Sequence, residues 1–317
     1  MSAFNRIARP VILAASRSNR LRHSAERLPI ARDVVGRFVP GETTDDALAA
    51  VRALRDSRMV SIDYLGEDVT DTDAAEATVK AYLDLLDALG ARVENAATVR
   101  PLEVSLKLSA LGQALPKDGD KIAFENAHTI CQRAQQVGVW VTVDAEDHTT
   151  TDSTLSIVRE LRTEFDWLGT VLQAYLKRSE ADCAEFAATG ARIRLCKGAY
   201  DEPASVAYRD AADVTGSYLR CLRTLMAGNG YPMVASHDPV VIAAAGEMAI
   251  EFGRDTDRFE YQMLYGIRDD EQRRLAAEGN QVRVYVPFGT QWYGYFVRRL
   301  AERPANLMFF LRALTHR

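Results

Sequence analysis

The stretch VWVTVDAED (139–147) carries the pattern that decides the fold. A short β-branched and aromatic run is followed directly by acidic residues, which is typical of a short buried strand that ends in a polar loop. Seven similar runs occur along the chain: VSIDYLG (60–66), LEVSLKLSAL (102–111), TVLQAYLKR (170–178), RIRLCKGAY (192–200), YPMVASHD (231–238), FEYQMLYG (259–266) and VRVYVPFG (282–289).

Helical stretches separate these strand-like runs, for example DAAEATVKAYLDLLDALG (73–90) and SVAYRDAADVTGSYLRCLRTLMAG (205–228). Strands that alternate with helices predict a parallel sheet. A count of eight favours a closed (β/α)8 barrel of the TIM type over an open doubly wound sheet. No GxGxxG follows the first strand, which weighs against a dinucleotide-binding fold.

The segment before the first strand has a different character. Residues 1–58 read as helices and turns, with apolar residues at helical spacing around DDALAAVRALRDSRM (45–59). We expect this N-terminal segment to pack on the outside of a catalytic barrel formed by residues 59–317. The chain shows no Gly/Ser-rich linker and no low-complexity segment, so we expect a single domain overall.

Composition excludes several classes of protein. The chain has 317 residues, 47% hydrophobic and 26% charged, with a net charge of −5 and no dominant basic stripe, so nucleic acid is not an expected partner. The four cysteines are scattered without CxxC spacing, which argues against a zinc site or a disulfide framework and suits a reducing compartment. No apolar run approaches the roughly 20 residues that span a bilayer, and the N-terminus does not resemble a signal peptide. We expect a cytoplasmic protein.

Polar and ionisable side chains collect near the carboxyl ends of the predicted strands, where active sites form in such barrels. Seven successive strands show this feature, which is unexpected for elements that bury both faces. The residues are Lys107, Asp144, Gln173, Arg194, Lys197, Tyr200, Ser236, His237, Asp238, Gln262 and Tyr285, with Gly198 and Ala199 between Lys197 and Tyr200.

The composition of this rim limits the chemistry. There is no HxH, no HExxH, no carboxylate cluster with metal-ligand spacing and no GxSxG. Lys107 or Lys197 could form a Schiff base, as in an aldolase-like lyase or a pyridoxal-phosphate enzyme. Alternatively, Gly198 and Ala199 leave bare backbone for a flat cofactor, with Arg194 beside an electron-accepting ring. A barrel that only binds a small carboxylate, as a sensor, is a third hypothesis.

A pair of adjacent cations near the end of the chain bears on this choice. Arg298 and Arg299 lie in the amphipathic stretch YFVRRLAERPANL (295–307), and Glu302 follows them by four and three residues. On a helix, Glu302 can therefore reach both guanidiniums. The residues alone fit either a solvated helix face with surface ion pairs or a fork for a substrate carboxylate.

Eight motifs in register give a more specific indication. The motifs SLKLSAL, VDAED, LQAYLKR, RLCKGAY, ASHD, YQMLYG, VRVYVPFG and RRLAERPAN occur in the order found in proline dehydrogenases, from about residue 60 to the end. The chain thus resembles that family of FAD-dependent barrel enzymes, and in particular its monofunctional bacterial members. The resemblance implies a distorted barrel whose last helix lies over the carboxyl ends of the strands instead of outside.

The resemblance also implies a role for individual positions. Asp144 and Arg194 match the active-site members, with Arg194 near the reactive part of the flavin. The positions that match substrate contacts are Lys107, Tyr200, Leu264, Tyr285, Arg298, Arg299 and Glu302, the two arginines binding the proline carboxylate and Glu302 orienting them. The positions that match flavin contacts are Ala145, Gln173, Arg194, Lys197, Gly198, Ala199, Ser236 and His237. A cationic surrounding of two arginines and a lysine would favour the neutral substrate amine.

Two motifs depart from the family pattern. In KGAYDEP, bifunctional relatives have a tryptophan after the tyrosine, and in ASHD, Ser236 and Asp238 replace a threonine and an asparagine. Tyr285 would crowd a hydroxyl on the substrate ring, so proline is favoured over hydroxyproline. The family resemblance further implies oxidation of L-proline to 1-pyrroline-5-carboxylate on the route to glutamate, a membrane quinone as electron acceptor with peripheral contact at the inner membrane face, and a separate pyrroline-5-carboxylate dehydrogenase.

Overall fold

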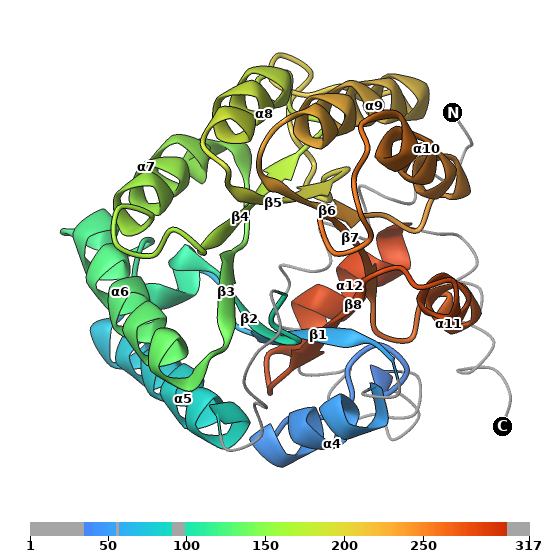
Figure 1. Cartoon of the computed structure of the whole chain (residues 1–317). Helices are drawn as coiled ribbons and strands as arrows, with labels where there is room; N and C mark the ends of the chain where they lie inside the picture. Colours follow the sequence, from blue (N-terminus) through green and yellow to red (C-terminus); the bar gives the residue numbers. More distant parts are fainter. Residues whose placement is uncertain (1–34, 55–56, 91–98, 303–317) are drawn as a thin grey trace, which may run out of the picture.

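Eight parallel strands close into one barrel in the computed structural model, which describes residues 35–54, 57–90 and 99–302, the last three without their side chains. The strands follow one another in chain order around the barrel (Figure 1). They are β1 (Met59–Tyr64), β2 (Leu102–Leu106), β3 (Trp140–Val143), β4 (Gly169–Gln173), β5 (Arg192–Cys196), β6 (Tyr231–Ala235), β7 (Glu260–Leu264) and β8 (Val282–Phe288). The predicted (β/α)8 fold is confirmed.

The barrel closes where the first strand meets the last. β1 pairs with β8 over six residues, from Met59 opposite Arg283 to Tyr64 opposite Phe288. All eight strands begin within one residue of the predicted starts, and all end before the predicted runs do. The ends of the runs form loops and short helices at the carboxyl end of the barrel.

Successive side chains of a strand point alternately outward, to the core between strands and helices, and inward, to the centre of the barrel. Val104 and Leu106 of β2 face outward and join the hydrophobic core between the barrel and its helices. Glu103 and Ser105 face the barrel axis, where they contact side chains of β1, β3 and β5. Both faces are buried, as expected for a parallel sheet covered by helices, but here the inner face is filled by polar and charged side chains.

Helices form the outer ring seen in Figure 1. They are α4 (Thr44–Leu54), α5 (Thr72–Gly90), α6 (Gly119–Val137), α7 (Thr151–Leu161), α8 (Ser179–Ala188), α9 (Ala211–Ala227), α10 (Pro239–Glu251) and α11 (Asp269–Ala277). The short 3-10 helices η2 (Leu108–Leu111) and η3 (His148–Thr150) follow β2 and β3, and α12 (Trp292–Glu302) follows β8. The helical stretch predicted over 205–228 was wrong at its start. The Asp210 side chain accepts a hydrogen bond from the Ala212 backbone N–H and begins α9 there as its N-cap.

The first and last described helices, α4 and α12, depart from a regular barrel. In a regular barrel the helix after the last strand packs on the outside, but here α4 occupies that position. α4 packs against β8 and β1 on the outside. α12 lies within the ring of outer helices in Figure 1, and its side chains contact residues that follow β1 and β5 at their carboxyl ends. The predicted placement of the last helix over the strand ends is therefore confirmed. Residues 1–34 and 303–317 lie outside the described part, so the proposed division at residue 58 stays a prediction.

Within the described ranges, no helix is both long enough and apolar enough to cross a bilayer. The four cysteines are free thiols, and three of them are buried among apolar residues.

Candidate active site

Lys107 lies at the centre of a cluster at the carboxyl end of the barrel. It directly follows β2 as the N-cap of η2, in extended backbone conformation. Its Nζ donates to Asp63 Oδ2 at 2.6 Å and to the Tyr285 hydroxyl at 3.5 Å, and lies 3.6 Å from Asp144 Oδ2. Burial opposes the charge, but Asp63 and Asp144 raise the pKa of Lys107 above its usual value. A Schiff-base lysine must reach its neutral form, so this environment disfavours the lyase hypothesis.

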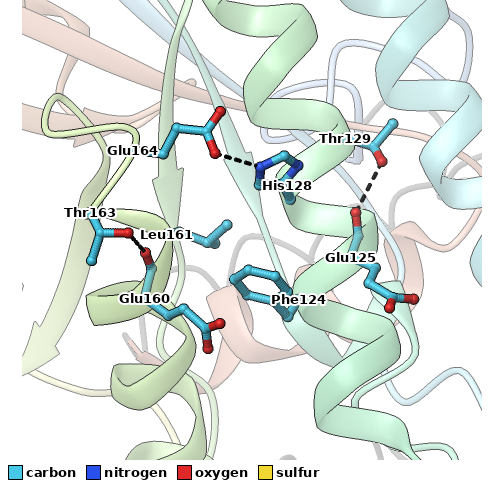
Figure 2. A pocket seen from close by; sticks show the side chains of 8 residues that line it. All are labelled: Phe124, Glu125, His128, Thr129, Glu160, Leu161, Thr163 and Glu164. Atoms are coloured by element: carbon cyan, nitrogen blue, oxygen red, sulfur yellow. Dashed lines mark hydrogen bonds and ion pairs between the residues drawn. The ribbon is translucent and has the colours of Figure 1, made fainter.

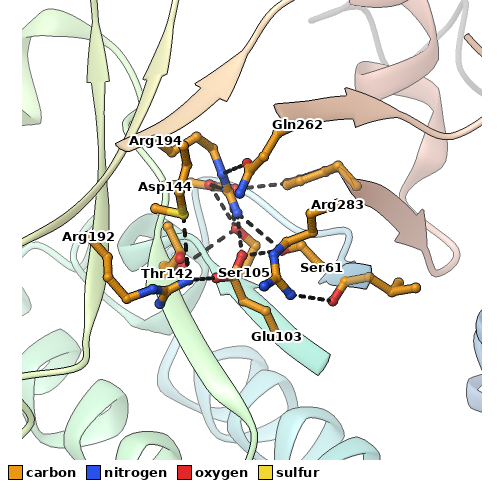
Figure 3. A network of polar contacts seen from close by, with 12 residues as sticks. Ser61, Glu103, Ser105, Thr142, Asp144, Arg192, Arg194, Gln262 and Arg283 are labelled. Atoms are coloured by element: carbon orange, nitrogen blue, oxygen red, sulfur yellow. Dashed lines mark hydrogen bonds and ion pairs between the residues drawn. The ribbon is translucent and has the colours of Figure 1, made fainter. Parts of the chain in front are cut away.

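Asp144 joins Lys107 to Arg194. The Tyr285 hydroxyl donates to Asp144 Oδ2 at 2.8 Å, while Arg194 Nη1 donates to Oδ1 at 2.6 Å. The guanidinium of Arg194 also lies 5.3 Å from the centre of the Tyr285 ring. The structure therefore brings together four residues predicted from separate motifs, which lie on β5 and β8 and directly after β2 and β3. Figure 3 shows Asp144 beside Arg194.

Below this cluster lies a network of buried charges that sequence reasoning missed. Glu103 contacts both Arg192 and Arg194, and Arg283 Nε donates to Glu260 Oε1 at 2.7 Å. Glu103, Arg192, Glu260 and Arg283 each occupy the first or second position of their strand. Ser61, Ser105 and Gln262 lie between the charged residues (Figure 3). A signal was present in the sequence: along several strands polar side chains stand at alternate positions, as in Glu103, Ser105 and Lys107.

The two arginines of α12 take different partners. Arg298 donates both Nη atoms to the carboxylate of Glu67, and its guanidinium lies 5.9 Å from the centre of the Tyr200 ring. Arg299 lies 5.0 Å from the Tyr295 ring. Despite burial, Glu67 raises the pKa of Arg298, and Asp63 adds to that effect. The predicted role of Glu302 concerns a side chain outside the described residues.

These pairs correct one physical argument made from the sequence. A cationic surrounding of Lys107, Arg298 and Arg299 was expected to favour the neutral form of a substrate amine. The structure gives Lys107 and Arg298 carboxylate partners, Asp63 and Glu67. These partners offset part of the positive charge, and an incoming carboxylate competes with Glu67 for Arg298.

The KGAY segment that follows β5 is held against the loop after β4. Gly198 has φ +103°, and a Cβ at this position would lie 2.2 Å from the Tyr175 ring, so only glycine fits. The Tyr175 backbone N–H donates to the Lys197 carbonyl at 2.9 Å. Glu202 anchors the far end of the segment, accepting hydrogen bonds from the His148 backbone and the Tyr175 hydroxyl.

The remaining predicted cofactor positions lie directly after β3, β5 and β6. Lys197 Nζ donates to Asp238 Oδ2 at 2.6 Å. His237 Nε2 accepts the backbone N–H of Leu264 at 3.0 Å, which connects the loop after β6 to the end of β7. Ser236 accepts the backbone N–H of Asp238, and Ala145 follows Asp144 directly.

Gln173, the last residue of β4, has one unsatisfied atom. Its Nε2 donates to the Glu146 carbonyl at 3.1 Å, but its buried Oε1 has no hydrogen-bond partner among the described residues. A buried acceptor without a donor is costly. A ligand that carries an N–H or O–H at this end of β4 would satisfy it.

Glu146 was also missed by the sequence analysis. It is buried, and it accepts hydrogen bonds from the backbone and the hydroxyl of Ser109. Burial raises the pKa of Glu146 to about 7. The acidic stretch VDAED indicated a polar loop, but one sequence does not show which of its carboxyls is enclosed.

A groove on the outside of the barrel contains none of the predicted site residues. It lies between α6 and α7 and is lined by Phe124, Glu125, His128, Thr129, Glu160, Leu161, Thr163 and Glu164 (Figure 2). The His128–Glu164 contact of 2.8 Å closes one side. Across the described part of the chain, no group of three or more histidine, cysteine, aspartate or glutamate side chains is placed to hold a metal ion.

Comparison with known proteins gives consistent results. The family model described as Proline dehydrogenase matches residues 47–312. Proline dehydrogenase of Deinococcus radiodurans is 43% identical over 282 residues, which is 88% of this chain and 89% of that protein. Proline dehydrogenase 2 of Bacillus subtilis strain 168 is 34% identical over 310 residues, 98% of this chain and 99% of that protein.

A solved structure has the same overall fold. The crystal structure of proline utilization A (PutA) from Bdellovibrio bacteriovorus, inactivated by N-propargylglycine, superposes with a TM-score of 0.78 at 25% identity. The match covers 95% of this chain and 36% of that one.

Proposed function

The chain belongs to the proline dehydrogenase family, and from this premise we propose that it oxidises L-proline to 1-pyrroline-5-carboxylate with FAD as its cofactor. The observation that carries the proposal is the contact of Arg298 with Glu67, which follows β1, and with Tyr200, which follows β5. This contact supports the proposal because Arg298, a cation suited to binding a carboxylate, meets Glu67 and Tyr200 at the carboxyl ends of the strands. Glu67 and Asp63 each raise the pKa values of both Lys107 and Arg298, which supports one shared site.

The residues fit a flavin on three observations. Gln173 Oε1 is a buried acceptor that lacks a donor, and the isoalloxazine ring carries an N–H. Gly198 provides bare backbone where any side chain would collide with Tyr175. Arg194 and Lys197 supply positive charge next to this backbone. A flavin held by these residues would supply the acceptor for the hydride that leaves the ring carbon beside the proline nitrogen.

The residues that would hold the cofactor are the predicted ones: Ala145, Gln173, Arg194, Lys197, Gly198, Ala199, Ser236 and His237. Leu264 belongs to the same region, since its backbone is fixed by His237. We place it, with Tyr200 and Tyr285, against the substrate ring.

The substrate carboxylate is the part of proline that this site can hold most firmly. We propose that Arg298 and Arg299 bind it, with Glu302 as their orienting partner and Lys107 on the opposite side. Because Glu67 occupies the fork of Arg298, the carboxylate must displace Glu67 from that fork. A bidentate anchor of this kind aims the reacting carbon, and orientation contributes several kcal/mol to a rate enhancement.

Asp144 and Tyr285 hold the reacting end of the pocket. The hydroxyl of Tyr285 is fixed by Asp144, so its ring forms a stable wall. Arg194 is held by Asp144 from above and by Glu103 from below. These contacts leave little freedom to the two residues proposed as active-site members, Asp144 and Arg194, and such preorganisation is what catalysis by oriented charges requires.

We further propose that a quinone reoxidises the enzyme, which would bring a cytoplasmic protein to the inner face of a membrane. The imine product hydrolyses to a semialdehyde, and a separate pyrroline-5-carboxylate dehydrogenase would convert it to glutamate. Both proposals rest on the family resemblance.

The reaction can be tested by its product. Purified protein incubated with L-proline and a soluble quinone analogue should release a compound that is lighter than proline by two hydrogens, detected by mass spectrometry. Omission of the quinone analogue under anaerobic conditions should limit the product to one equivalent per flavin. Absence of this compound in the presence of bound flavin would contradict the assigned substrate.

A further inference from the structure

Glu103 lies directly beneath Arg194 in the barrel interior. Its Oε1 accepts hydrogen bonds from Arg194 Nη2 at 2.6 Å and from the Ser61 hydroxyl at 2.7 Å, while its Oε2 contacts Arg192. The side chain is fully buried. Figure 3 shows Glu103 between the two arginines of β5.

Arg194 is thus one cation between two carboxylates. Asp144 contacts it on the side of the candidate active site, and Glu103 contacts it on the side of the barrel floor. Burial opposes ionisation of Glu103, but Arg192, Arg283 and Arg194 hold the pKa of its carboxyl well below the usual range. Glu103 is therefore a fixed negative charge in a water-poor interior, where charges act over longer distances than in solvent.

Arg192 balances Glu103 from the other side. It contacts the second oxygen of Glu103, donates to the Trp167 carbonyl at 3.2 Å and stacks on Trp140 at 3.7 Å. It contacts neither Asp144 nor Tyr285 in the described structure. Its effect on the active site must therefore pass through Glu103 and the local electric field.

We infer that Glu103 is a positioning residue for the proposed reaction: it aims Arg194 and, together with Arg192, sets the positive charge that Arg194 presents to the flavin. The inference rests on the proposed function, since it needs a flavin beside Arg194. Reduction of a flavin adds negative charge, so more positive charge at Arg194 favours the reduced form.

This inference predicts shifts of opposite sign from two neighbouring substitutions. Glu103→Gln removes a negative charge beneath Arg194 and should raise the midpoint potential of the flavin. Arg192→Met leaves Glu103 with excess negative charge and should lower it. The double variant restores the balance and should lie between the two, near the parent protein. A salt bridge with a purely structural role would lower stability in both single variants without this pattern.

Glu260 supplies a matched control. It is as deeply buried as Glu103, but its carboxylate contacts Arg283, Gln262 and Tyr231 and does not contact Arg194. Glu260→Gln should therefore shift the potential less than Glu103→Gln. An equal shift would show that any buried charge has the same effect, and would overturn the specific role of Glu103.

The experiment is an anaerobic dye-coupled titration of each flavin-loaded variant, with the visible spectrum as readout. Opposite shifts in Glu103→Gln and Arg192→Met support the inference, and equal potentials or shifts of one sign overturn it. If Glu103→Gln does not fold, Glu103→Asp provides the test. This variant keeps the charge but withdraws the carboxylate from Arg194, so it should raise the midpoint potential by less than the loss of the charge would. An unchanged potential in Glu103→Asp also contradicts the inference. A parent protein that binds no flavin contradicts the proposed function instead.

Discussion

Pairs of acidic and basic side chains occur both at the floor of the barrel, near the amino ends of the strands, and at its mouth, near their carboxyl ends. The two sets have different roles. On the floor, Glu103, Arg192, Glu260 and Arg283 are almost completely enclosed, and each contacts an opposite charge. At the mouth, Lys107, Asp144 and Arg298 also have ionic partners, but they lie next to partly exposed residues and to groups with unused acceptors, such as Asp63 Oδ1.

The difference shows how burial decides the role of a charge. A floor residue has no route to a ligand, so its pairs can only support the fold or act on the site through Arg194. A mouth residue can exchange its partner for a substrate group, as Arg298 can exchange Glu67. The same ion pair is thus a structural contact at one end of the barrel and a binding site at the other.

The largest effect is expected on the floor. Glu260→Gln leaves Arg283 buried without its carboxylate, and breaking such a pair costs about 3–5 kcal/mol. Urea unfolding should show this loss. The control is Glu180→Gln on the surface of α8, where the carboxylate pairs with the exposed Arg220 and the expected loss is below about 1 kcal/mol. Similar losses in both variants would refute the contrast between floor and surface.

Glu146 at the mouth predicts a dependence of stability on pH. Burial raises its pKa to about 7, so the folded state holds a proton that the unfolded state releases near pH 4. Stability should therefore fall as the pH rises towards 7, by up to about 3 kcal/mol. Glu146→Gln removes this contribution. The stability of the variant relative to the parent should therefore grow between about pH 4.5 and pH 7, the pKa values of this carboxyl in the unfolded and folded states.

Unfolding midpoints of both proteins across this range provide the measurement. Glu125→Gln on the exposed face of α6 should leave the pH profile unchanged. Parallel profiles for the parent and Glu146→Gln would show that this carboxyl does not titrate as its burial predicts.

Arg298→Ala should act on binding and leave the fold intact. Removal of a bidentate anchor should raise the KM for proline by about 10- to 100-fold, while kcat changes less, because the contact exists before and during the reaction. Steady-state kinetics with the quinone analogue measures both constants. A KM within about twofold of the parent value would exclude the carboxylate role.

Gly198→Ala tests the cofactor segment. A methyl group here collides with Tyr175 in a backbone conformation that disfavours side chains, and we expect flavin affinity to fall by about tenfold or more. Gly253→Ala is the control, since Gly253 also has positive φ but nothing within 4 Å of the added methyl. Quenching of flavin fluorescence on binding gives both dissociation constants, and equal values would contradict a role for the Gly198–Tyr175 contact.

The smallest effect is expected from Tyr285→Phe. The variant loses the hydrogen bond to Asp144, worth about 1 kcal/mol, so kcat/KM for proline should fall about fivefold. Room gained beside the ring should raise the activity on hydroxyproline relative to proline. A ratio that does not change would place Tyr285 away from the substituted ring carbon.

The strands and the polar residues at their carboxyl ends could both be predicted from the sequence. An apolar run indicates the strand, and the change to a polar residue such as Asp144 or Lys107 marks where the strand ends. The charges of the floor could not be placed in this way. Polar and apolar residues alternate around Glu103 and Arg283, but both faces of a strand are buried in a parallel barrel, so the pattern does not show which of these charges form pairs.

Long-range partners lay beyond sequence reasoning. Glu67 and Arg298 are 231 positions apart, and only the placement of α12 over the strand ends brings them together. The start of α9 was missed for a local reason, since the capping role of Asp210 competes with the helical periodicity of the residues before it.

The most direct measurement is the visible spectrum of the purified protein before and after anaerobic addition of L-proline. We predict a flavin absorption band that bleaches when proline is added, which reports cofactor, substrate and hydride transfer together. A protein that stays colourless after reconstitution with FAD, or a flavin band that proline does not change, would contradict the proposed reaction.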